Sequence, residues 1–166
     1  GPVTGPGPAR QPVGDADRDS AYVDASGGDS LSRRECLDYL AMADLGHLAL
    51  SQGALPVVVP VNLALVGEEV IVRTQPGSKL VAAALHAVVA VQAEGVAPDR
   101  RHAWSVLVQG VAREVTHPDQ LAWLRREGPR PLVPHRGGHF IAIPTQLISG
   151  RRFPLRPEDD GRFHEL

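Results

Sequence analysis

The sequence predicts a mainly β protein, an antiparallel barrel that is closed or half-open, with about six strands and two or three helices. Two observations lead to this prediction. Short β-rich segments follow one another through tight turns, and strands and helices do not alternate in the regular way that builds a parallel sheet. Because a barrel removes most free strand edges, it suits a single domain of 166 residues.

The two ends of the chain differ in composition from its middle. Residues 1–28 are rich in Gly, Pro, Asp and Ala, and such a segment buries too little apolar surface to offset the entropy of ordering it. We therefore expect residues 1–28 to be disordered, residues 29–153 to form the folded domain, and the charged residues 154–166 to be a peripheral tail.

The folded part begins with a helix and continues as a meander of strands. Ser32 and Glu35 form a capping box, which predicts a helix that ends near Asp44. Tight turns then separate three expected strands, at 47–51, 55–66 and 69–74. Pro56 and Pro60 cannot donate to a strand ladder, so they indicate an edge or a bulge.

The second half repeats this mixture of strands and short helices. Ser78 is the expected N-cap of a second helix, and Gly110 marks a bend in a long strand. The expected strands lie at 87–93, 104–115 and 139–149, and a third helix is expected at 116–127. The loops 95–103 and 128–138 are irregular and have no predicted place in the fold.

Composition and charge exclude some classes of function for this protein. The formal net charge of −2 argues against a general nucleic-acid-binding protein, which usually carries a basic patch. No apolar run has the length of a membrane span, and the N-terminus lacks the pattern of a secretory signal, so we expect a cytoplasmic protein without a membrane partner. The single cysteine, Cys36, is expected to be a small buried apolar residue.

The segment from Val70 to Lys79 is the most informative for chemistry. A strand delivers Arg73 and Thr74 to a Gly-containing turn, and Ser78 and Lys79 open the next helix. Free N–H groups at a helix start, two cationic side chains and two hydroxyls make a suitable phosphate site. The alternative is a capped helix after a surface turn whose charges are solvated.

This segment resembles the phosphate-binding element of the flavoproteins related to pyridoxamine 5′-phosphate oxidase. The segment 55–65, with its two prolines and Asn62, resembles the strand pair on which the flavin ring lies. The segment 104–110 resembles the strand that meets the cofactor across a dimer, and 143–152 resembles the last strand of actinobacterial members. The resemblance implies a six-stranded split β-barrel and a symmetric homodimer with FMN at its interface.

The same resemblance implies roles for individual residues. Four residues would hold the phosphate: Arg73, Thr74, Ser78 and Lys79. Four consecutive residues would face the edge of the ring: Val59, Pro60, Val61 and Asn62. Trp104 and Gln109 would reach the cofactor from the opposing subunit, and Arg151 would place positive charge near it. The alternatives are core or interface packing for Trp104, an outward-facing strand position for Gln109, and a solvated charge for Arg151.

The implied function is that of a flavin-dependent oxidoreductase acting on a small molecule. The segment Arg151-Arg152-Phe153 leads into a charged tail without the Trp of true pyridoxamine 5′-phosphate oxidases, so that substrate is not expected. Two alternatives stay open. One is a deazaflavin coenzyme whose acidic tail would follow basic loop residues, namely Arg100, Arg101, Arg125, Arg126 and Arg130. The other is a dimer that binds flavin or haem without catalysis.

No catalytic acid or base and no metal site stand out. His135 and His139 have the spacing of a zinc pair, but Gly137 and Gly138 between them disfavour the helix that such a pair needs.

Overall fold

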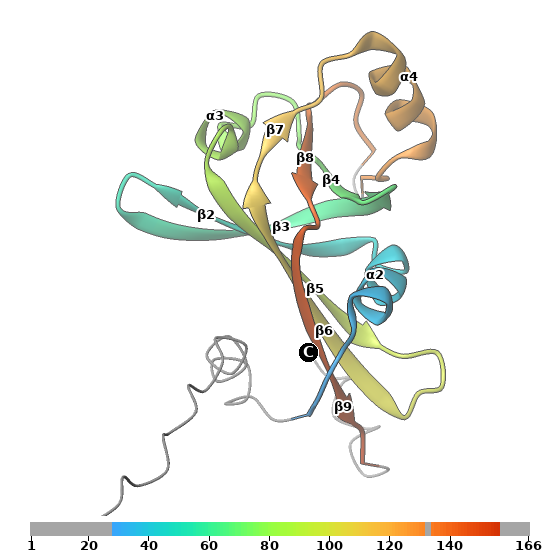
Figure 1. Cartoon of the computed structure of the whole chain (residues 1–166). Coiled ribbons are helices and arrows are strands. Elements are labelled where there is room, and N and C mark those ends of the chain that lie inside the picture. Colours follow the sequence, from blue (N-terminus) through green and yellow to red (C-terminus); the bar gives the residue numbers. More distant parts are fainter. Residues whose placement is uncertain (1–27, 132–133, 157–166) are drawn as a thin grey trace, which may run out of the picture.

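The computed structural model describes residues 28–131 and 134–156. Its described part contains one nine-stranded antiparallel sheet, in the order β1-β9-β6-β5-β2-β3-β4-β8-β7, and three helices that pack against it (Figure 1). The strands are β1 (Asp29–Ser30), β2 (Leu45–Gln52), β3 (Leu55–Val66), β4 (Glu69–Arg73), β5 (Val88–Val96), β6 (His102–Val111), β7 (Arg113–Glu114), β8 (Phe140–Pro144) and β9 (Leu147–Pro154). The helices are α2 (Arg33–Ala41), α3 (Leu80–Ala84) and α4 (Pro118–Glu127).

The predicted fold class, a mainly β antiparallel split barrel, is confirmed, whereas the count of six strands is wrong. Disorder is expected over residues 1–28, and all of these except Gly28 lie outside the described residues. The tail beyond residue 156 lies outside them as well. None of the described helices is long and apolar enough to cross a membrane.

Helix α2 begins with the predicted capping box. Ser32 Oγ accepts a hydrogen bond from the Glu35 N–H at 3.2 Å, and Glu35 Oε1 accepts one from the Ser32 N–H at 3.1 Å. The helix ends at Ala41, three residues before the expected end at Asp44. It packs Leu40 and Cys36 into the main core; burial raises the pKa of the Cys36 thiol, in agreement with the expected apolar role.

Strand β3 has the predicted bounds, and its prolines lie on an edge. The half that carries Pro56 and Pro60 pairs with β2, while β4 pairs with β3 only from Asn62 onward. One side of β3 is therefore without a neighbouring described strand up to Val61. A proline is tolerated in such a place because no neighbouring strand needs the hydrogen bond that its missing N–H would donate.

The last predicted strand, 139–149, is in fact two strands. The chain leaves β8 at Thr145, whose N–H and Oγ1 both donate to the Glu68 carbonyl, at 3.1 and 2.6 Å, and whose carbonyl accepts a hydrogen bond from Arg33. It then continues as β9, which pairs with β6 as far as Pro154. Strands β1 and β7 contain two residues each, and so short a pairing leaves no periodic pattern in the sequence.

The sheet curls around the main core, and a second core lies on its other face, beneath α4. Gly110 of β6 meets Pro144 of β8 so closely that an added Cβ would lie 3.1 Å from the proline Cγ. The main core includes Val70 and Val72 of β4. Ile71, between them, points to the opposite face and belongs to a second core beneath α4, formed with Val115, Leu124, Phe140 and Ala142. Arg73 lies on this same face of β4, at its end.

Candidate functional site

A groove of about 600 Å³ runs between strand β3 and the turn that joins β4 to α3. It brings together seven of the predicted site residues: Val59, Pro60, Val61, Asn62, Arg73, Thr74 and Ser78. The rest of its lining consists of Leu45, Gln75, Pro76, Gly77, Leu80, Pro131 and His135. Within the described ranges, no carboxylate lines this groove.

The β3 side of the groove combines apolar side chains with a strand edge. Val61 is buried in the main core and Val59 packs against that core, whereas Pro60 is exposed and belongs to the other face of the strand together with Asn62. Because this stretch of β3 has its strand partner on one side only, backbone polar groups along the other side are available to a ligand.

Arg73 places a guanidinium at the opposite side of the groove. Its Cζ lies 5.3 Å from the centroid of the Phe140 ring, and its Nη1 and Nη2 donate long hydrogen bonds to the carbonyls of Pro129, at 3.4 Å, and Gly137, at 3.5 Å. Its Nε is buried and has no hydrogen-bond partner among the described residues. The side chain is thus held in place while retaining capacity to bind an anion.

Ser78 adds a hydroxyl to the same end of the groove. Ser78 Oγ accepts a hydrogen bond from the Leu80 N–H at 3.2 Å, so its hydroxyl hydrogen stays available for a ligand oxygen. The expectation that Ser78 is the N-cap is off by one residue, because Lys79 is the N-cap of α3. Lys79 itself is exposed and does not line the groove.

Thr74 has a structural partner for its hydroxyl. The side chain is 3% exposed, and Oγ1 donates to the His139 carbonyl at 3.2 Å and accepts from the His139 N–H at 3.1 Å. Since a hydroxyl carries one hydrogen, the donor that the phosphate role requires is already used. Thr74 instead fastens the loop before β8 to the end of β4.

The structure does not bring Trp104, Gln109 or Arg151 into the groove. Trp104 is 4% exposed and stacks on Tyr39 of α2, with 5.2 Å between ring centroids, so core packing accounts for it within one chain. Gln109 is exposed and lies on the opposite face of β6 from Trp104, because the two residues are five positions apart in the strand. Arg151 is buried and donates to the Gly28 carbonyl at 2.8 Å.

His135 is a groove residue that the sequence reasoning missed. It comes from the loop 128–138, and its Nδ1 is buried without a hydrogen-bond partner among the described residues. The contacts of that loop with Arg73 and Thr74 bring His135 to the groove, and no local pattern encodes these long-range contacts. Within the described ranges, no three His, Cys, Asp or Glu side chains gather as metal ligands would.

A second groove, of about 520 Å³, continues from the first and is rich in arginine. The two grooves share Arg73, Pro131 and His135. The second also contains four further arginines: Arg125, Arg126, Arg130 and Arg136. None of these four forms an ion pair with another described residue. Arg100 and Arg101, expected in the same basic groove, lie instead between β5 and β6.

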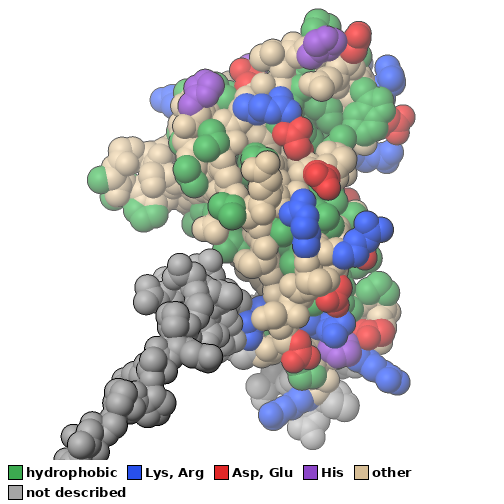
Figure 2. All heavy atoms as spheres, in the orientation of Figure 1, with side chains coloured by type: hydrophobic (Ala, Val, Ile, Leu, Met, Phe, Trp, Pro, Cys, Tyr) green, Lys and Arg blue, Asp and Glu red, His purple; other side chains and the backbone are tan. Residues whose placement is uncertain are grey.

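One face of the molecule shows how charged side chains are distributed around the sheet (Figure 2). On the face shown in Figure 2, Lys and Arg side chains alternate with Asp and Glu side chains. The arginine-rich groove is therefore a local concentration of charge next to the candidate site.

Comparisons with known proteins connect this fold to flavin-binding proteins. The family model described as pyridoxamine 5′-phosphate oxidase matches residues 32–152. The uncharacterized protein Rv0080 of Mycobacterium tuberculosis is 35% identical over 127 residues, which are 74% of this chain and 83% of that protein.

Two solved structures from Mycobacterium smegmatis share the fold. An FAD-binding protein is 31% identical and superposes with a TM-score of 0.62 over 76% of this chain and 98% of its own. An FAD- and haem-binding protein is 19% identical, with a TM-score of 0.60 over 79% of this chain and 78% of its own, a likeness that extends to the fold alone.

Proposed function

Because this chain belongs to the pyridoxamine 5′-phosphate oxidase family, we propose that it binds a flavin in the groove between β3 and the β4–α3 turn and acts as an oxidoreductase on a small molecule. One observation carries the proposal: a strand edge with apolar side chains faces a fixed guanidinium and a hydroxyl across one groove. The 31% identical mycobacterial protein that binds FAD supports the cofactor class.

The chemistry of the groove fits FMN. The flat ring needs an apolar surface, which Leu45, Val59, Pro60 and Leu80 offer. Its polar edge needs hydrogen-bonding groups, which the backbone of β3 and Asn62 offer. The phosphate needs a cation and donors, and Arg73 and Ser78 supply both. A bound flavin supplies the redox chemistry, while the protein supplies position and electrostatics.

The arginine-rich groove favours a second candidate cofactor with a longer anionic tail. A tail that leaves the first groove past Arg73 and His135 would enter the arginine-rich groove, where four arginines have no carboxylate partner among the described residues. A second phosphate, as in FAD, or the acidic tail of a deazaflavin coenzyme would gain charge-assisted hydrogen bonds there. Arg125, Arg126 and Arg130 are exposed and line this groove, so they are accessible to an acidic tail.

We also propose that a second copy of the chain covers the sheet face on which the groove opens. Strand pairing aligns one row of side chains across five strands, namely Val58, Ala49, Ala90, Gln109 and Leu147. Val58 is 63% exposed and Leu147 is 66% exposed. Pro60 and Asn62 follow Val58 on the same face of β3, so a partner on this row would border the flavin and bring its own Gln109 near it.

Flavin absorbance tests the site. Wild-type protein is titrated with FMN, FAD and a deazaflavin coenzyme, and the titrations are repeated with Arg73→Ala and with Arg34→Ala. Arg34 is a matched control because it is exposed on α2, away from the groove. Loss of a charge-assisted contact predicts about 10- to 100-fold weaker flavin binding for Arg73→Ala. Arg34→Ala is expected to bind like the wild type.

The same titration separates the two cofactor candidates. The double variant Arg125→Gln and Arg126→Gln is expected to bind FMN normally if FMN is the cofactor, and to lose affinity for FAD or the deazaflavin if a longer tail uses the second groove. Wild-type protein that binds none of the three compounds, or a correctly folded Arg73→Ala variant that binds as the wild type does, overturns the proposed site.

A further inference from the structure

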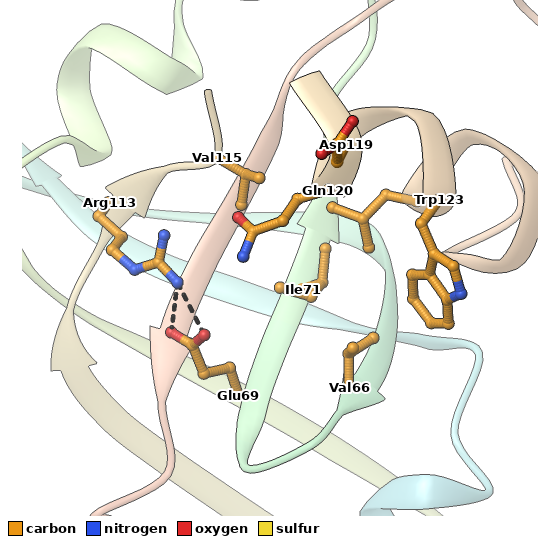
Figure 3. A pocket seen from close by; sticks show the side chains of 9 residues that line it. Val66, Glu69, Ile71, Arg113, Val115, Asp119, Gln120 and Trp123 are labelled. Carbon is orange, nitrogen blue, oxygen red and sulfur yellow. Dashed lines mark hydrogen bonds and ion pairs between the residues drawn. The ribbon is translucent and has the colours of Figure 1, made fainter. Parts of the chain in front are cut away.

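A second cavity, of about 280 Å³, lies between α4 and the strands β4 and β7 and shares no lining residue with the flavin groove (Figure 3). Its lining consists of Val66, Glu69, Ile71, Arg113, Val115, Asp119, Gln120, Trp123 and Leu124. None of these residues has a role in the proposed flavin function, so that function does not account for the cavity.

The interior of this cavity is apolar. Ile71, Val115 and Leu124 are buried members of the second core, and they present one side to the cavity. Trp123 belongs to α4, and its side of the helix is not covered, since the residue is 40% exposed. In Figure 3 its ring hangs from α4 on the side of Val66. An indole held at the mouth of an apolar cavity offers a flat face for a small aromatic ring.

The rim of the cavity carries an excess of negative charge. Arg113 Nη2 donates to both carboxylate oxygens of Glu69, at 2.7 and 3.0 Å, so the only cation among the described lining residues is already matched by a lining anion. Asp119, in the first turn of α4, makes no ion pair with another described residue and leaves one carboxylate in excess. The flavin groove has the opposite charge balance, because within the described ranges its lining includes a guanidinium and no carboxylate.

We propose that this cavity is a second binding site, which takes a small aromatic amine in its protonated form. The ring would fill the apolar interior against Ile71 and Val115, and the ammonium group would lie at the rim, where Asp119 attracts it and the face of Trp123 adds a cation–π contribution. An aromatic carboxylate of the same size would meet the excess negative charge. The volume admits one substituted ring, which is near the lower limit for small-molecule sites.

Three probes with the same ring test the charge preference: benzylamine, benzyl alcohol and benzoate. Binding is followed through the NMR methyl shifts of Val66, Ile71, Val115 and Leu124, with a Kd on the order of 1 mM expected for ligands this small. We expect benzylamine to bind about 3-fold or more tightly than benzoate, with benzyl alcohol between them. Asp119→Asn should remove this preference while retaining benzyl alcohol, whereas Asp38→Asn, an exposed control on α2, should preserve it.

A cavity-filling variant tests the location. Val66→Phe should abolish the shifts for all three probes, while Val96→Phe, at a site 51% exposed and outside this cavity, should leave them unchanged. The proposal is overturned if no probe moves the lining methyl signals, if benzoate binds best, or if the filled variant binds as well as the wild type. It is also overturned if Val66→Phe changes the oligomeric state, because a second copy would then be the occupant. Flavin binding is independent of all these outcomes.

Discussion

Gly138 and Gly77 share a backbone conformation but differ in their surroundings. Gly138 has φ +86° and Gly77 has φ +74°, values that side chains other than glycine rarely adopt. A Cβ added at Gly138 would lie 2.1 Å from the Thr74 carbonyl oxygen, whereas one added at Gly77 would meet no atom within 4 Å. Of these two glycines, only Gly138 brings two backbone segments together through its missing side chain.

We therefore predict different costs for the same substitution. Gly77→Ala should lower the free energy of unfolding by about 1 kcal/mol, because the alanine must adopt the positive φ but meets no steric clash. Gly138→Ala should lower it by more than about 2 kcal/mol and should weaken flavin binding, because the loop that carries His135 must move away from Thr74. Urea unfolding and flavin titration of both variants measure this. Equal losses in the two variants would show that the contact with Thr74 is unimportant.

Residue types and the family resemblance together predicted much of the groove but not which side chains are free to bind. Arg73 and Ser78 reach it as expected, because they flank a turn that follows a strand directly. Thr74 lies between them in the chain, yet its hydroxyl bonds to His139, 65 residues away in sequence. Trp104 was assigned to the cofactor by resemblance, and the contact with Tyr39 of α2 that accounts for its position has no local pattern.

At the scale of the element, the start of α2 depends on a charge that titrates. The Ser32 N–H and then the Ser32 hydroxyl hold the pKa of the Glu35 carboxyl below its ordinary value. A carboxyl whose pKa is lowered on folding adds stability above its unfolded pKa of about 4.5 and loses this contribution as the pH falls through the lower folded pKa. The contribution of the capping box to the stability of α2 therefore depends on pH.

We predict that Glu35→Gln lowers the Tm at pH 7 and that the difference from the wild type shrinks as the pH falls below 4.5. Ser32→Ala should cost about 1 kcal/mol at pH 7, since it removes the cap itself. Thermal melts followed by circular dichroism at pH 7, 5 and 3.5 test both variants. A Glu35→Gln difference that grows as the pH falls would contradict the assigned direction of the pKa shift.

The elements were predictable wherever their signals are local. The bounds of β3 follow from its apolar run and flanking turns, and its prolines indicated an edge or a bulge, of which the structure has the edge. The division of the last strand was not predictable, since it depends on the bonds of Thr145 to Glu68, 77 residues away in sequence. Helix α3 was predicted from Ser78 and the helical spacing that follows it, although it begins one residue later than expected.

At the scale of the whole molecule, strand register decides what the two faces of the sheet can do. The regular pairing of β2 with β3 puts Val58 and Leu55 on opposite faces, because they are three residues apart in one strand. The two side chains are similarly exposed, Val58 at 63% and Leu55 at 72%. A partner that covers the row from Val58 to Leu147 would bury Val58 and leave Leu55 outside that contact.

This difference gives a matched test of the proposed dimer. We predict that wild-type protein has twice the chain mass in sedimentation equilibrium and that Val58→Asp shifts it to the monomer, because a buried carboxylate without a partner is costly. Leu55→Asp should remain dimeric and bind flavin normally. If the flavin lies at the interface, Val58→Asp should also weaken flavin binding at low protein concentration and recover part of it at high concentration. A wild-type monomer that binds flavin would reject the dimer and keep the cofactor site, whereas a dimer unaffected by Val58→Asp would assign the contact to another face.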